Sequence, residues 1–149
     1  MTPEDEEERQ LAVDLFNHSW TLLDLPERTP EQDDELIHAA HASRHHWAAV
    51  GTPANVARGE WQLSRVYTVL GRPEPALYHA RRCLAYCEAN PDALEDWDLP
   101  YAHEALARAS SLAGEADDAR RHAAVARELA SRVADAEDRE HLEEDLATL

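Results

Sequence analysis

The sequence contains no lysine, only four glycines and two cysteines, and no long run of apolar residues. The missing lysine excludes Schiff-base chemistry and a P-loop, because both depend on a lysine ammonium group. A membrane-spanning helix needs about 18 or more consecutive apolar residues, and no segment approaches that length. The N-terminus, M-T-P-E-D-E-E-E-R, is acidic where a signal peptide is basic and then apolar. We therefore expect a soluble, cytoplasmic protein.

The two cysteines, Cys83 and Cys87, are spaced C-x-x-x-C rather than as a redox C-x-x-C. They share one helical face with Ala76 and Ala80, so we expect them to be buried as small apolar residues. A structural zinc site usually takes four ligands from two separated pairs, and one pair is present here.

Acidic residues outnumber arginines and concentrate at the two ends of the chain. The formal net charge is −17, with −10 in residues 1–35, −6 in residues 135–149 and −1 between them. Acidic ends repel the phosphate backbone of a nucleic acid. We therefore expect no nucleic-acid partner.

Apolar spacing and breaker residues predict an all-α protein of about seven helices and no strands. Short connections between consecutive helices indicate antiparallel hairpins. At 149 residues the chain suits a single domain. The expected hairpins and capping helix span residues 4–50, 54–90, 99–133 and 136–146.

Two of these hairpins resemble each other at an offset of 43 residues. The offset superposes identical residues at five positions, the pairs Leu63 and Leu106, Gly71 and Gly114, Ala76 and Ala119, His79 and His122, and Ala80 and Ala123. Repetition of this kind indicates copies of one helix-turn-helix unit.

These residues resemble the tetratricopeptide repeat family. Its unit has a leucine, a small residue and an aromatic in the first helix, a glycine near the turn and small residues in the second helix. The matching residues are Leu63, Ser64, Tyr67, Gly71, Ala76, Ala80 and Cys83, then Leu106, Ala107, Gly114, Ala119, Ala123 and Ala126. The resemblance implies a right-handed superhelix that binds a protein or peptide on its concave face. The family period is about 34 residues, so the longer offset implies an inserted loop at residues 90–98.

The first helix of each matching hairpin presents one polar and aromatic face away from its core positions. We expect these faces to form a groove that binds a partner, lined by Arg58, Trp61, Arg65, Tyr101, Glu104 and Arg108. Arginine binds carboxylate or phosphate through two parallel hydrogen bonds, which favours a partner with an anionic group. The alternative is that these arginines only pair with Glu60, Asp98 or Glu104.

Histidines form a second candidate site on the helix predicted at residues 31–50. His38, His41 and His45 share one face with Asp34, opposite the apolar Leu36 and Trp47. Such spacing brings imidazoles together, so these three histidines are candidate ligands for a divalent metal. The alternatives are a solvated face and a contact with a small molecule or partner. His18, among leucines on the first helix, is expected in the core.

The sequence thus favours a non-enzymatic protein- or peptide-binding module without a cofactor. The alternative is a small-molecule or metal-dependent enzyme that uses His38, His41 and His45. Self-association is also open, because the alanine-rich sixth helix and the acidic seventh can dock on another copy.

Overall fold

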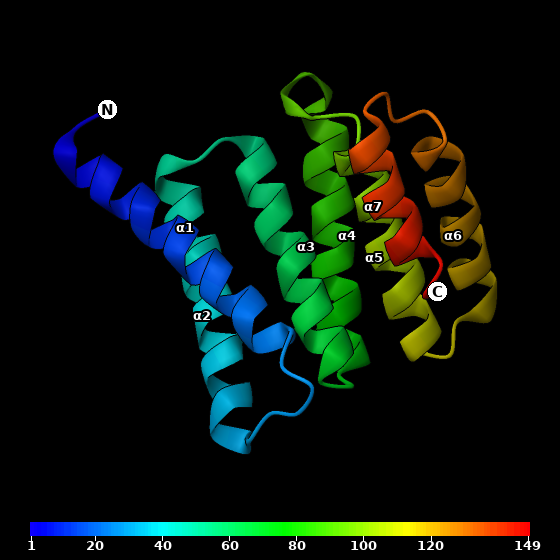
Figure 1. The fold of residues 1–149 in the computed structure, drawn as a ribbon, viewed down its shortest axis with the longest axis horizontal. Helices are drawn as coiled ribbons and strands as arrows, with labels where there is room; N and C mark the ends of the chain where they lie inside the picture. Colours follow the sequence, from blue (N-terminus) through cyan, green and yellow to red (C-terminus); the bar gives the residue numbers. More distant parts are fainter.

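The computed structural model describes all 149 residues, and they form seven α-helices, one 3-10 turn and no strand. The helices pack mainly on their neighbours along the chain, most closely within the pairs α1 with α2, α3 with α4 and α5 with α6. From α1 to α6 they follow one another across the molecule, and α7 turns back between α6 and α4, over α5 in this view (Figure 1). The all-α prediction is confirmed, and the sequential packing is consistent with stacked hairpins. None of the helices combines the length and apolar composition needed to cross a bilayer. The elements are α1 (Pro3–Leu23), α2 (Pro30–Val50), α3 (Pro53–Val69), α4 (Pro73–Ala89), η1 (Pro91–Ala93), α5 (Asp98–Leu112), α6 (Ala116–Ala130) and α7 (Ala136–Leu146).

The first three helices begin with the same local device. A threonine precedes a proline, and the threonine hydroxyl accepts a hydrogen bond from the third residue of the helix, whose side chain bonds back to the threonine N–H. This capping box satisfies otherwise free N–H groups, and proline at the first position fixes a helical φ. The three threonines are Thr2, Thr29 and Thr52. Local sequence therefore sets these boundaries.

The core is a series of small interfaces between neighbouring helices. Leu36 of α2 packs with Leu63 of α3, and alanines of α4 pack with alanines of α5. Small side chains also let backbones approach closely, as where the Ser64 hydroxyl donates to the carbonyl of Ala76 at 2.9 Å. At the C-terminal end, Leu142 and Leu146 of α7 pack on α6.

Two expectations about the helices were wrong in detail. The sixth helix was expected to reach residue 133 but ends at Ala130, and Val133 is still buried because it packs beside α7 after the chain has turned. His18 is exposed rather than in the core. The buried residues of α1 are Ala12, Ser19 and Leu22, and this register turns His18 toward Glu35, 3.1 Å away.

The glycines that follow α3 and α5 have the left-handed backbone conformation. Their φ values are +72° at Gly71 and +78° at Gly114, and an added Cβ would meet no atom within 4 Å. The 43-residue offset therefore aligns two turns of the same local geometry.

We predict that Gly71→Ala and Gly114→Ala each lower the free energy of unfolding by about 1 kcal/mol, the cost of a Cβ in the left-handed region. Because space is free at both turns, this loss of stability comes from the backbone conformation alone. The corresponding asparagine variants should lose less stability, because asparagine tolerates the left-handed region. Denaturant unfolding measures both. Equal stability of the alanine variants and the native chain would contradict this account.

The offset also aligns two polar pairs that join a first helix to the second helix of its hairpin. Glu60 and His79 are 2.5 Å apart, and at the equivalent positions the Nδ1 atoms of His103 and His122 are 3.0 Å apart. Burial first, and then the nearby His122, lower the pKa of His103 to about 4. Burial and the charge of Arg121 lower the pKa of His122, which Asp118 partly offsets.

Folding lowers the pKa of His103 below its ordinary value of 6.5. The buried neutral ring therefore contributes its full stability only above pH 6.5. That contribution is lost as the pH falls from 6.5 toward 4, because the unfolded chain binds the proton first. Between pH 6.5 and 4, we expect the free energy of unfolding of His103→Gln to fall by about 1–2 kcal/mol less than that of the native chain. This figure is reduced for solvent screening, because the ring is only half-buried. Unfolding curves at several pH values measure it, and His45→Gln, at an exposed position, should follow the native curve.

Candidate functional site: an aromatic pocket between the first and last helices

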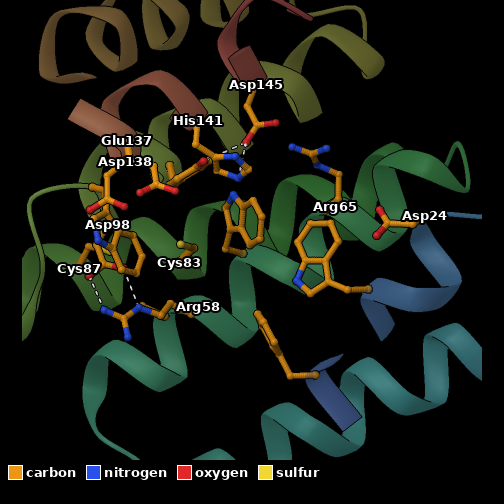
Figure 2. Close-up of a pocket in the computed structure, with 16 residues that line it drawn as sticks. Asp24, Arg58, Arg65, Cys83, Cys87, Asp98, Glu137, Asp138, His141 and Asp145 are labelled. Carbon is orange, nitrogen blue, oxygen red and sulfur yellow. Dashed lines mark hydrogen bonds and ion pairs between the residues drawn. The ribbon is translucent and has the colours of Figure 1, made fainter. Parts of the chain in front are cut away.

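A pocket of about 810 Å³ lies where the odd-numbered helices α1, α3, α5 and α7 face one another (Figure 2). Ala57 of α3 and the buried thiols Cys83 and Cys87 of α4 complete its lining. The prediction that both cysteines are buried is confirmed. The aromatic lining residues are Phe16, Trp20, Trp61, Trp97 and Tyr101, and the charged or titratable ones are Asp24, Arg58, Arg65, Asp98, Glu137, Asp138, His141 and Asp145.

The aromatic side chains form a continuous wall. The rings of Trp20 and Trp61 are 5.4 Å apart between centroids, and Trp61 meets Tyr101 edge-on at 5.3 Å. Tyr101 in turn meets Trp97 at 6.5 Å. Aromatic pairs at such separations stabilise one another, and they give a pocket large and inflexible apolar surfaces. Rings from α1, α3 and the start of α5 thus hold the wall together.

Arg58 is held by Asp98, the first residue of α5. The guanidinium donates two parallel hydrogen bonds to the carboxylate, at 2.9 and 2.8 Å, and these raise the pKa of Arg58. Its carbon centre lies 4.4 Å from the ring centroid of Trp97. The carboxylate of Asp98 is almost fully buried, so its charge is compensated mainly by Arg58. This pair joins α3 to the first residue of α5.

Glu104 of α5 is completely buried and accepts three hydrogen bonds. The indole N–H of Trp61 donates to it at 3.2 Å, Arg65 at 2.7 Å and Arg108 at 2.8 Å. A buried carboxylate is costly unless such donors saturate it. Glu104 therefore fixes the indole of Trp61 and two arginines together.

Helix α7 closes one side of the pocket. The hydroxyl of Tyr101 donates to Asp145 at 2.9 Å, and burial together with this bond raises the pKa of Tyr101. Arg108 donates to the Asp145 carbonyl at 3.1 Å and to the Thr148 hydroxyl at 2.8 Å. Figure 2 shows Glu137, Asp138, His141 and Asp145 of this helix on the side of the pocket opposite Arg58.

The six residues expected to line the groove do lie together. Four of them line the pocket, whereas Glu104 and Arg108 lie behind its wall. The ion pairs of the alternative interpretation are also present, since Arg58 binds Asp98 and Arg65 binds Glu104.

Sequence reasoning missed the contributions of α1 and α7. Trp20 and Asp24 were not singled out, and α7 was expected as a cap or as a surface for self-association, not as part of the pocket. The four-residue spacing of Glu137, His141 and Asp145 was the available signal, because it places them on one face of a helix.

The histidine face lies outside this pocket. His38, His41 and His45 are exposed on α2, and none of them lines the pocket. His41 instead lies 2.8 Å from the hydroxyl of Tyr67, and its ring meets that of His79. No three His, Cys, Asp or Glu side chains are grouped so that they could hold a metal ion. The fold therefore separates the histidine face from the pocket and joins His41 to neighbours on α3 and α4.

A second polar network connects α2, α3 and α4. Glu60 of α3 receives a hydrogen bond from Arg44 at 3.1 Å and pairs with His79. Burial acts to raise the pKa of Glu60, but the His79 hydrogen bond and the charges of His79 and Arg44 outweigh it, so the pKa is lowered. Arg44 also donates to the hydroxyl of Tyr86 at 3.2 Å. These residues hold three helices together and do not line the pocket.

Comparison with known proteins identifies no relative. No protein-family model matches the chain, and no curated protein and no solved structure matches it either.

We predict that Glu104→Gln lowers the free energy of unfolding by about 2–4 kcal/mol, because it leaves two arginines without their counter-charge. Glu128→Gln is the matched control. That residue pairs with Arg132 at the surface, where an ion pair contributes about 0–1 kcal/mol. Denaturant unfolding of both variants measures the difference. Similar small losses would show that the Glu104 pairs are not structural.

Proposed function

We propose that this protein is a non-enzymatic module that binds a partner protein through a short peptide segment or chain end. The segment would occupy the aromatic pocket between α1, α3, α5 and α7. The proposal includes a tetratricopeptide-like right-handed stack, in which the first helix of each hairpin faces the groove. Its support is the 43-residue repetition together with two equivalent left-handed glycines, Gly71 and Gly114.

The observation that carries the proposal is an aromatic pocket with a fixed wall. A volume of about 810 Å³ lies within the range of about 300–1,000 Å³ common for ligand sites. Tryptophan and tyrosine supply much of the affinity at protein interfaces, since they bury a large area at little cost in conformational entropy. The hydrogen bonds of Glu104 hold Trp61 in place before a partner arrives, which reduces the ordering cost of binding.

The buried carboxylates in and behind the pocket wall also favour binding over catalysis. The carboxylates of Asp98 and Glu104 are each engaged by arginine donors. A general base needs an available lone pair directed at a substrate proton. Because these two carboxylates hold α3 and α5 together, we assign them to the framework of the site.

A displayed library of random peptides tests this function, with selection on the native protein and affinity measured for the selected peptides. We predict that Trp20→Ala weakens binding at least about tenfold, as loss of an aromatic anchor does. Tyr78→Ala is the control, because this exposed tyrosine of α4 lies outside the pocket. Circular dichroism verifies that both variants fold. Selected peptides that bind Trp20→Ala and the native protein equally would refute the proposal.

A further inference from the structure

The two arginines of the pocket are already neutralised by buried acids. Arg58 makes two hydrogen bonds to Asp98, and Arg65 donates to Glu104. Both carboxylates are nearly or completely inaccessible to solvent. An arriving anion would have to compete with these partners for each guanidinium, and any success would leave a buried carboxylate uncompensated. The arginines therefore do not make the pocket a receptor for anions.

The charges that remain open to the pocket are negative. Asp24, Glu137 and Asp138 line it, are exposed and form no ion pair. Asp145 accepts the Tyr101 hydroxyl and lies 3.9 Å from His141, with no arginine side chain paired to its carboxylate. Figure 2 shows Asp24 on one side of the pocket and the α7 carboxylates on another, so negative charge flanks the aromatic wall.

The aromatic wall has the chemistry that suits a cation. The faces of tryptophan and tyrosine rings are negatively polarised and attract guanidinium and ammonium groups. The pocket already contains two such contacts, because Arg58 lies 4.4 Å from the ring of Trp97 and Arg65 lies 5.6 Å from that of Trp61. A third cation between these rings and the open carboxylates would gain both kinds of attraction.

We infer that the partner presents a basic segment, with an arginine or lysine side chain inserted against the tryptophan wall and its charge facing Asp24 and the acids of α7. This inference rests on the proposed peptide-binding function and specifies the sign of the ligand. The sequence analysis expected an anionic partner, because it identified the arginines but could not show that buried carboxylates neutralise them. The inferred charge of the partner is therefore the opposite. The net charge of −17 also favours the approach of basic partners.

Four fluorescent octapeptides of one design, carrying two arginines, two lysines, two citrullines or two glutamates on an alanine and glycine background, test the charge requirement by fluorescence anisotropy. Citrulline keeps the shape of arginine without its charge. We expect the arginine and lysine peptides to bind, the citrulline peptide to bind at least about tenfold more weakly, and the glutamate peptide not to bind. Raising the salt concentration from about 50 to 300 mM should weaken the basic peptides, since screening reduces charge attraction.

Two triple variants separate the pocket from general attraction to an acidic protein. In the pocket variant, Asp24→Asn, Glu137→Gln and Asp138→Asn remove three open charges. In the control variant, Asp14→Asn, Glu140→Gln and Glu143→Gln remove three exposed charges from α1 and α7, outside the pocket lining. We expect at least about tenfold weaker binding of the arginine peptide to the pocket variant and less than about threefold to the control. All the changed side chains are exposed or make no ion pair, so folding should persist.

Any of the following outcomes would overturn the inference of a basic partner. Equal binding of the citrulline and arginine peptides would show that charge is not recognised, and equal losses in the two variants would show attraction to the whole surface. If the peptides selected from the random library depend on Trp20 but are acidic or neutral, the binding function stands and the basic partner is refuted. If no peptide of any charge depends on Trp20, both proposals fail together.

Discussion

The buried carboxylate of Glu104 is the interaction on which the pocket depends. It lies where α3 faces α5, and it accepts hydrogen bonds from Trp61, Arg65 and Arg108. Burial of a carboxylate without donors is strongly unfavourable, so the three donors and the acid require one another. The orientation of the Trp61 indole, and with it the aromatic wall from Trp20 to Tyr101, follows from this arrangement.

Equivalent positions of the two similar hairpins contact each other because successive first helices lie side by side. Trp61 and Glu104 are 43 residues apart and form a hydrogen bond, although they occupy the same position in their repeats. Where one copy has Glu60 with His79, the other has His103 with His122. At equivalent positions, Trp61 and Glu104 are thus complementary rather than identical, and this difference gives the wall a specific polar contact.

The helices could be predicted from sequence because their ends are marked locally. Thr-Pro pairs begin three helices, and Gly71 and Gly114 follow two others. The grouping of the α3 and α5 residues followed from the repeat. The sequence could not place α7 against the pocket, since that depends on the angle at which Leu142 and Leu146 pack on α6. The sequence also could not show which acid pairs with which arginine. Those pairings determine the sign of the charge that stays unpaired in the pocket.

Helix α7 has two roles that cannot be separated. Its leucines cover the apolar face of α6, and its acidic face completes the pocket. Any occupant that contacts this acidic face therefore binds only chains in which α7 is docked, and by mass action it must slow the fraying of the last helix. Occupancy of the pocket is thus thermodynamically coupled to protection of α7 backbone amides from hydrogen exchange. Under the proposed function, protection of the α7 amides would therefore report on whether a partner is bound.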